Sequence, residues 1–289
     1  MSTPVIQARG LTKKYRDLIA LNNLDFTIES GRIVGVIGPN GAGKTTALQA
    51  ILGLIPFKGD LNVLGMNPAV QRTELLEDVC FIADTAILPR WMTVAQLMDY
   101  VETVHRKFSQ ETFLQFLQNS NIQLHKKVGE LSKGMMTKLH LALVMAIDAK
   151  LLVLDEPTLG LDILNRKEFY STLLSEYFDH DKTILITTHL VEEVEHILTD
   201  VMFINDGDIV LNEEMENISE QYVEVDVKKA DMDKAQSENP FYVKPTLSGG
   251  AYFYRKVNGS YSHLGAEKIP SIADLFVAMM KKETITDGV

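Results

Sequence analysis

Residues 38–45 read GPNGAGKT, which matches the phosphate-binding pattern G-x-x-x-x-G-K-[ST]. In this pattern the glycines let backbone N–H groups turn inward around phosphates. The lysine reaches the outer phosphate oxygens, and the final hydroxyl group binds Mg²⁺. The apolar run RIVGVIG precedes the loop, and a helix is predicted from Lys44 to about Leu52, closed by Gly53. This order of strand, loop and helix favours a nucleotide-phosphate site over a chance glycine-rich turn.

The loop and the start of its helix supply most of the predicted phosphate contacts. Thr45 is in addition a predicted metal ligand, because its hydroxyl group can face Mg²⁺. The residues concerned are Gly38, Pro39, Asn40, Gly41, Ala42, Gly43, Lys44, Thr45 and Thr46.

Two acids end a second apolar run, LLVLDE at residues 151–156. After a phosphate-binding loop, such a strand predicts that Asp155 holds Mg²⁺ through water and that Glu156 orients or deprotonates the attacking water. The alternative is a pair of carboxylates that are merely solvated at a strand end. His189 closes a third apolar run, TILITTH, and is predicted to sense the γ-phosphate, although a lone histidine there is more often structural.

A second candidate anion site lies at residues 130–138, ELSKGMMTK. Ser132 stands at the cap position of a predicted helix, and the apolar run LHLALVMAI follows it. The first N–H groups of a helix lack partners within the helix, so Ser132 and Gly134 mark a place that favours negative charge. The sequence therefore contains two phosphate sites and raises the question of which phosphate the second one holds.

The fold class predicted from the periodicity is α/β. Apolar strands alternate with helices, which argues for a P-loop core with a mostly parallel sheet covered on both faces. A helical block interrupts this core, with a capping box at Thr93 and Gln96. We predict core segments at 1–85 and 149–216, a helical insert at 86–148, and a small α+β appendage at 217–289 whose short strands are antiparallel.

The composition limits the possible classes of protein. The net charge is −11, with the acidic excess confined to the second half of the chain, so no nucleic-acid partner is expected. The one cysteine, Cys80, lies in an apolar run, so its side chain is predicted to be buried. A single cysteine cannot form a disulfide within the chain, which fits a protein in a reducing compartment. The N-terminus has no secretory h-region, and no apolar run approaches the roughly 18–20 residues that span a bilayer. We therefore expect a cytoplasmic chain that reaches the inner face of the membrane only through a partner.

Together, GPNGAGKT, LSKGM, LLVLDEPTLGLD and TTH, in this order and spacing, resemble the motifs of the ATP-binding subunits of ABC transporters over about residues 5–215. The resemblance implies ATP and Mg²⁺ as ligands, with Tyr15 stacked on adenine and Asp162 of LGLD facing a second subunit. It further implies a head-to-tail dimer in which Ser132 and Gly134 grip the γ-phosphate held by the other subunit's Lys44. From the residues alone, Tyr15 could be a core aromatic and Asp162 an N-terminal helix charge.

The chain departs from the family pattern in three ways. The signature usually reads LSGGQ, and here Lys133 and Met135 replace its third and fifth residues. Asp84 stands where the family has a glutamine, and we predict that it binds Mg²⁺ or its water and takes over the coupling role with a shorter, charged side chain. There is also only one ATP-binding unit, so the dimer partner is expected to be a second copy or a paralogue.

The resulting prediction is an ATPase subunit that powers a separate transmembrane permease. The entry to the helical block and the C-terminal helix resemble the bacterial branch that exports drugs, bacteriocins, lipids or ions. Two alternatives stay open. One is a soluble ABC-type ATPase acting on ribosomes or DNA, which usually has two ATP units or long coiled coils. The other is a regulatory subunit that binds nucleotide with little turnover, against which Glu156 argues.

Overall fold

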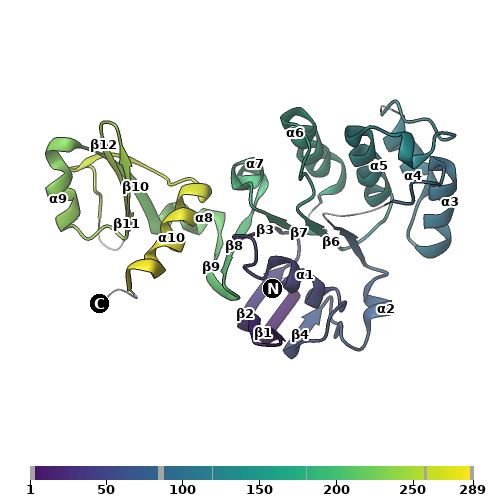
Figure 1. Cartoon of the computed structure of the whole chain (residues 1–289), viewed down its shortest axis with the longest axis horizontal. Coiled ribbons are helices and arrows are strands. Elements are labelled where there is room, and N and C mark those ends of the chain that lie inside the picture. Colours follow the sequence, from purple (N-terminus) through teal and green to yellow (C-terminus); the bar gives the residue numbers. More distant parts are fainter. Residues whose placement is uncertain (1–3, 84–87, 119, 180, 257–258, 287–289) are drawn as a thin grey trace.

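The computed structural model describes residues 4–83, 88–118, 120–179, 181–256 and 259–286. Its centre is a six-stranded sheet in the order β5-β6-β7-β3-β8-β9 (Figure 1). All neighbours in this sheet pair in parallel except β8 and β9, so the predicted mostly parallel sheet is confirmed. The strands are β3 (Ile33–Ile37), β5 (Val79–Ile82), β6 (Leu151–Asp155), β7 (Thr183–Thr188), β8 (Asp200–Asn205) and β9 (Asp208–Glu214).

The first two strands do not join the main sheet. β1 (Pro4–Tyr15) pairs antiparallel with β2 (Leu18–Glu29) on one side and with β4 (Lys58–Val63) on the other. Helix α1 (Lys44–Ile51) lies between this three-stranded sheet and the main sheet, and apolar side chains of both sheets share one cluster with it (Figure 1). The sequence did not predict that these strands form a separate sheet, because strand patterns do not specify a pairing partner.

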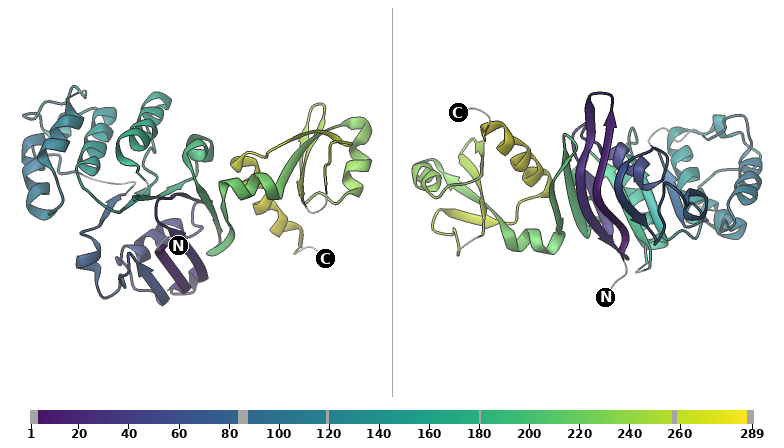
Figure 2. Two further views of the ribbon diagram at one scale, coloured as in Figure 1. Left: turned by 180° about the vertical axis from the view of Figure 1, so that it is seen from behind. Right: turned by 90° about the horizontal axis from the view of Figure 1, so that it is seen from below.

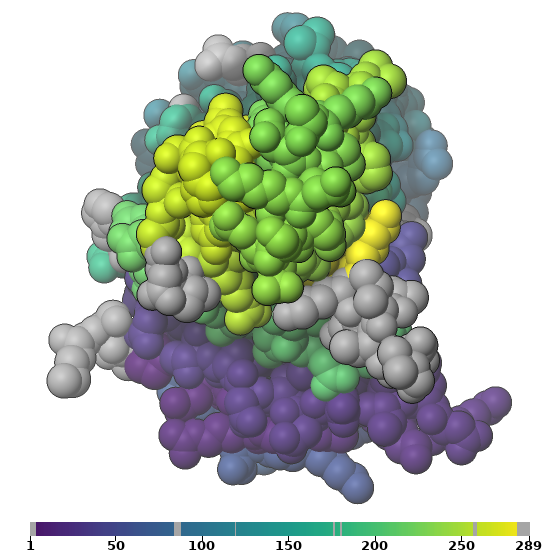
Figure 3. All heavy atoms as spheres, turned by 90° about the vertical axis from the view of Figure 1, so that its left-hand side faces the viewer, coloured from purple at the N-terminus to yellow at the C-terminus, as the bar shows by residue number. Residues whose placement is uncertain are grey.

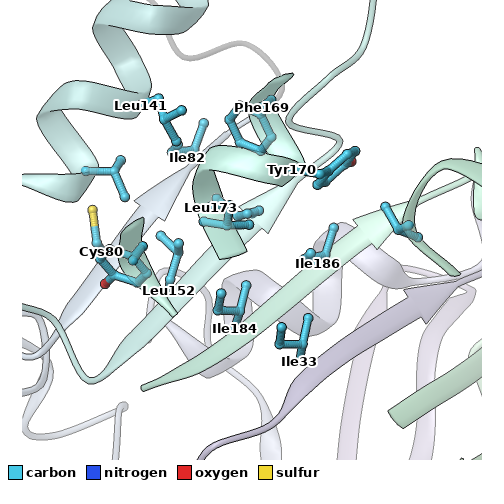
Figure 4. Packing of buried hydrophobic residues seen from close by; sticks show 14 of the residues in the cluster. Ile33, Cys80, Ile82, Leu141, Leu152, Phe169, Tyr170, Leu173, Ile184 and Ile186 are labelled. Carbon is cyan, nitrogen blue, oxygen red and sulfur yellow. The ribbon is translucent and has the colours of Figure 1, made fainter. Parts of the chain in front are cut away.

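The helical insert covers the other side of the main sheet at one end. Its members are α3 (Val94–Val104), α4 (Gln110–Leu117), the short 3₁₀ turn η1 (Val128–Glu130) and α5 (Lys133–Met145), after the single turn α2 (Arg72–Leu75). The capping box predicted at the start of α3 is present, with Thr93 and Gln96 bonding reciprocally. Cys80 is buried, as predicted, among side chains from α5, α6 (Ile163–Thr172) and the strands below them (Figure 4).

Residues beyond β9 form a second, antiparallel sheet in the order β11-β12-β10-β13. Its strands are β10 (Tyr222–Lys228), β11 (Tyr242–Thr246), β12 (Gly249–Arg255) and β13 (Gly265–Lys268). Helix α8 (Met215–Gln221) leads into it. Helix α9 (Met232–Ser237) packs on one face, and α10 (Ile272–Thr286) packs on the other. We call this sheet with its three helices the appendage.

The appendage and the helical insert lie at opposite ends of the main sheet (Figures 1 and 2). Seen from its own end, the appendage forms a rounded face above the N-terminal strands (Figure 3). Its last helix nevertheless belongs to the main core, because Ile272, Leu275 and Met279 of α10 are buried in the same cluster as side chains of β7 and β8. The rings of Phe276 and Phe203 also meet edge to face, 5.2 Å between centroids.

Remaining turns complete the connections: the π-helical turn η2 (Leu173–Tyr177), α7 (Val191–Val194) with the 3₁₀ turn η3 (Glu195–Ile197), and the 3₁₀ turn η4 (Lys229–Asp231). Helix α7 follows β7 directly and contacts α10. No helix among the described residues is both long and apolar enough to cross a membrane.

Candidate functional site

The loop between β3 and α1 is shaped to surround phosphates. Gly43 has a left-handed backbone (φ 110°), and a Cβ atom there would lie 2.5 Å from the carbonyl oxygen of Ala20, so no larger residue fits. Gly41 also has positive φ (87°). Helix α1 begins at Lys44, so its first N–H groups point toward the loop and favour an anion there.

Lys44 is held inside this loop. Its Nζ donates to the carbonyl oxygens of Gly38 (2.7 Å) and Pro39 (3.2 Å), and the residue is buried. Burial lowers the pKa of Lys44, and the nearby carboxylates of Glu156 and Asp155 oppose that shift. When a nucleotide binds, the ammonium group of Lys44 can donate to phosphate oxygens in place of the two backbone carbonyls.

The two acids end β6, beside the loop. Thr45 Oγ1 donates to Asp155 Oδ2 at 2.9 Å, which joins the start of α1 to the end of β6. The other carboxylate oxygen, Oδ1, accepts from the hydroxyl group of Thr187 on the neighbouring strand β7. Asp155 is therefore buried but hydrogen-bonded through both oxygens, which keeps its carboxylate in one orientation.

Glu156 has an unusual backbone. Its φ is +49°, a left-handed conformation that costs about 1–3 kcal/mol for a residue other than glycine and often marks functional sites. The strain is supported by Thr187, whose carbonyl and hydroxyl oxygens accept from Glu156 N at 3.1 and 3.2 Å. Glu156 Oε2 lies 2.9 Å from His189 Nδ1. Because a carboxylate only accepts, the hydrogen of this bond belongs to the imidazole.

These groups open into one cleft of about 810 Å³. Tyr15 lies in its wall, together with residues of the loop, both acids and His189, so the structure brings together the main sequence-predicted residues. Thr187 was not singled out from the sequence, although two threonines in a buried strand directly before His189 are a signal that could have identified it. Gln49, Phe81 and Leu159 also line the cleft, and no sequence pattern indicated them.

The cleft suits Mg²⁺ bound together with a nucleotide. The hydroxyl of Thr45 and the carboxylate of Asp155 are neighbouring hard oxygen ligands, of the kind that Mg²⁺ prefers. Within the described part of the chain, no group of three or more His, Cys, Asp or Glu side chains forms a metal cage. Mg²⁺ is usually held by one or two protein groups plus phosphates and water, and Thr45 and Asp155 could supply the protein groups. Asp84, the other predicted metal ligand, lies outside the described residues.

The remaining predicted residues do not line this cleft. Ser132 caps α5, its Oγ accepting from Met135 N at 3.3 Å, and Gly134 lies on the first turn of that helix. Asp162 caps α6, its Oδ1 accepting from Asn165 N at 3.0 Å, and this backbone bond lowers the pKa of Asp162. Gly134 instead lines a groove between α4, α5 and α6. Ser132 and Gly134 therefore do not line the cleft that contains Lys44, although their neighbour Lys133 lines a small pocket together with Glu156.

Comparisons with known proteins identify the family of the chain. The family described as ABC transporter matches residues 21–159. The Nod factor export ATP-binding protein I of Burkholderia orbicola (strain AU 1054) is 35% identical over 214 residues, covering 72% of this chain and 70% of the relative. The uncharacterized ABC transporter ATP-binding protein YhcH of Bacillus subtilis (strain 168) is 25% identical over 276 residues, 94% of this chain and 88% of YhcH.

Solved structures show the same fold. One described as the structure of the ATP binding subunit of an ABC transporter superposes with a TM-score of 0.67 at 22% identity, covering 74% of this chain and 91% of that one. The chain therefore belongs to the family of ABC transporter ATP-binding proteins, whose ATP-binding domains hydrolyse ATP.

Proposed function

We propose that this chain is the ATPase subunit of an ABC exporter and that it works as a head-to-tail dimer with two shared ATP sites. The observation that carries the proposal is the separation of Ser132 and Gly134 from the cleft that contains Lys44. Each chain then has half of a phosphate site at α1 and another half at α5. A second copy or a paralogue completes both halves, and ATP becomes part of the interface.

In this proposal the residues of the cleft divide the chemistry among them. The loop N–H groups and Lys44 bind the β- and γ-phosphates, and Tyr15 stacks on the base. Thr45 and Asp155 would hold Mg²⁺, which when bound supplies positive charge to the phosphate oxygens. Glu156 takes a proton from water as the water oxygen attacks the γ-phosphorus, and the bond from that phosphorus to the bridging oxygen of ADP breaks.

His189 has two tasks in this scheme. Its Nδ1–H holds the carboxylate of Glu156, 2.9 Å away, and so orients the general base. That bond leaves Nε2 for the γ-phosphate. Nε2 can donate to a phosphate oxygen only in the ring form that has a hydrogen on both nitrogens.

The membrane side of the function rests on the relatives. One of them is named an export protein, which supports an exporter, and the family supports a separate permease as partner. The chain would then lie at the cytoplasmic face of the membrane, attached through that permease. We also propose the division into residues 1–216 as the ATP-binding domain, interrupted by the insert 86–148, and 217–289 as the accessory region.

A mixing experiment tests the shared sites. Lys44→Ala removes the fixed cation of one half, and Ser132→Arg fills the other half with a bulky side chain. Each variant alone should fail to dimerise with ATP. In a heterodimer of the two variants, both lesions fall on the same composite site and the other site is wild type. The mixture should therefore recover ATP-dependent dimerisation, measured by gel filtration.

The matched control pairs Lys44→Ala with a chain that has both substitutions. No intact composite site can then form, so this mixture should stay monomeric. If the first mixture also stays monomeric while wild type dimerises with ATP, the signature helix serves its own chain and the head-to-tail arrangement is wrong.

A further inference from the structure

Tyr15 occupies an exposed position for a residue that has to stack on a base. It is the last residue of β1 and pairs with Leu18 across the two-residue turn Arg16–Asp17, where Arg16 has positive φ (52°). Its side chain lines the nucleotide cleft and is 42% exposed. A ring at the end of a hairpin has few neighbours to fix its orientation, and a free ring loses conformational entropy when a ligand stacks on it.

Lys13 supplies the missing support. It lies two residues before Tyr15 on β1. Its Nζ is 4.7 Å from the centroid of the tyrosine ring, within the range of a cation–π contact. The same Nζ donates to the carbonyl oxygen of Pro56 at 2.7 Å. One ammonium group therefore ties the ring to the segment that follows helix α1.

The contact between Lys13 and the ring of Tyr15 lies outside the cleft wall, because Tyr15 lines the cleft and Lys13 does not. Leu18 and Ala20 of β2 line the same cleft, and neither has a polar side-chain group that could read the edges of a base. Recognition at this end of the cleft therefore depends on stacking, which every purine can provide.

We propose that Lys13 is a positioning residue for nucleotide binding: it braces the back of Tyr15 so that the ring presents its open side to the purine. This inference rests on the proposed role of Tyr15 as the base platform. It differs from that role because it assigns part of the affinity for the base to a cation that touches neither the base nor the phosphates. The brace acts on ATP and GTP alike and has no effect on a ligand without a base.

The test compares three ligands: ATP, GTP and inorganic triphosphate. Their dissociation constants are measured by isothermal titration calorimetry with wild type, Lys13→Met, Lys13→Arg and Lys14→Met. Methionine keeps most of the length of lysine but removes the charge. Lys13→Met should weaken ATP and GTP by about two- to fivefold and leave triphosphate unchanged. Lys13→Arg should restore wild-type binding, because a guanidinium group also makes cation–π contacts.

Lys14→Met is the matched control, because it removes the same charge from the exposed neighbouring residue. It should leave all three dissociation constants unchanged. If Lys13→Met weakens triphosphate as much as ATP, the lysine acts through its general charge and the brace is wrong. Unchanged ATP binding in Lys13→Met would also overturn it.

Tyr15→Ala separates the inference from the function on which it rests. If Tyr15→Ala weakens ATP but not triphosphate while Lys13→Met changes neither, the base platform stands and the brace alone fails. If Tyr15→Ala leaves ATP binding unchanged, the platform and the brace fail together. In steady-state kinetics the brace predicts a higher KM for ATP in Lys13→Met and an unchanged kcat, a split that a general loss of folding would not produce.

Discussion

The nucleotide cleft and the appendage treat their buried charges differently. In the cleft, Lys44 and Asp155 are buried at the edge of an open space, and the neighbouring Glu156 holds a strained backbone. In the appendage, the buried acid Glu224 is neutralised by Lys268 at 3.0 Å, and apolar side chains from both faces of its sheet pack against helices. Both regions therefore contain buried charge, but in the cleft it borders an open space, whereas in the appendage an ion pair neutralises it.

Helix α10 packs against both regions. The start of α10 is hydrogen-bonded to the core, because Ile272 N donates to the carboxylate oxygen Oε1 of Glu195 at 3.0 Å. Glu195 follows α7, which itself begins two residues after His189. One side of α10 completes the main core and the other covers the sheet of the appendage, so the two regions share side chains even though their sheets are separate.

Glu156→Gln should have the largest effect and should act on chemistry alone. The amide keeps the shape of the side chain but cannot accept the proton of the attacking water, so hydrolysis should slow by roughly 10²–10⁴ while ATP binding persists. Single-turnover ATPase and equilibrium ATP binding measure the two effects. The melting temperature serves as control and should stay near that of wild type. Near-normal hydrolysis in this variant would contradict the role of Glu156 as the general base.

Leu275→Ala should lower the free energy of unfolding and leave the rate of ATP hydrolysis nearly unchanged. Leu275 is fully buried in the core cluster, and truncating such a side chain costs about 2–5 kcal/mol of unfolding free energy. Because α10 belongs to both regions, unfolding in urea should remain a single transition at a lower midpoint, with an unchanged KM for ATP.

The control is Val277→Ala on the same helix, where the side chain is 39% exposed and the cost should be much smaller. Two separated transitions in Leu275→Ala would show that the appendage unfolds independently and that the shared core is wrong.

The smallest predicted effect is on the loss of folding stability at low pH. The residue His140 of α5 is partly exposed, but its Nε2 is buried, and desolvation of the ring lowers the pKa of His140 from 6.5 to about 4. The unfolded chain therefore binds a proton that the folded chain refuses, and the free energy of unfolding falls as the pH drops from about 6.5 to about 4. The full loss is at most roughly 3 kcal/mol.

Replacing His140 with Leu should remove this part of the acid sensitivity. Urea unfolding at pH 7 and pH 4.5 should show a smaller loss of stability for His140→Leu than for wild type. His263→Leu in the appendage is the control, because His263 is exposed and paired with Glu238 at 2.6 Å. If His140→Leu loses as much unfolding free energy between pH 7 and pH 4.5 as wild type does, His140 does not contribute to the acid sensitivity of the core.

Much of the site could be predicted from local sequence. The phosphate loop, the two acids at the end of β6 and the histidine at the end of β7 were predicted from short motifs at the ends of apolar strands. They lie together because the carboxyl ends of neighbouring parallel strands share one edge of a sheet. The assignment of roles to these residues stays a prediction until the experiments above are done. The contribution of Thr187 became visible only from its bonds to Asp155 and Glu156.

The sequence by itself determined the local elements: the strands by their apolar runs, the starts of α3 and α5 by Thr93 and Ser132, and the loop conformation by its glycines. These features depend on hydrogen bonds and side-chain spacing over a few residues. Only the tertiary structure decided that β1, β2 and β4 form their own sheet and that α10 closes the main core. It also decided that Ser132 lies away from Lys44. Each of these depends on packing between segments far apart in the chain, which no local pattern specifies.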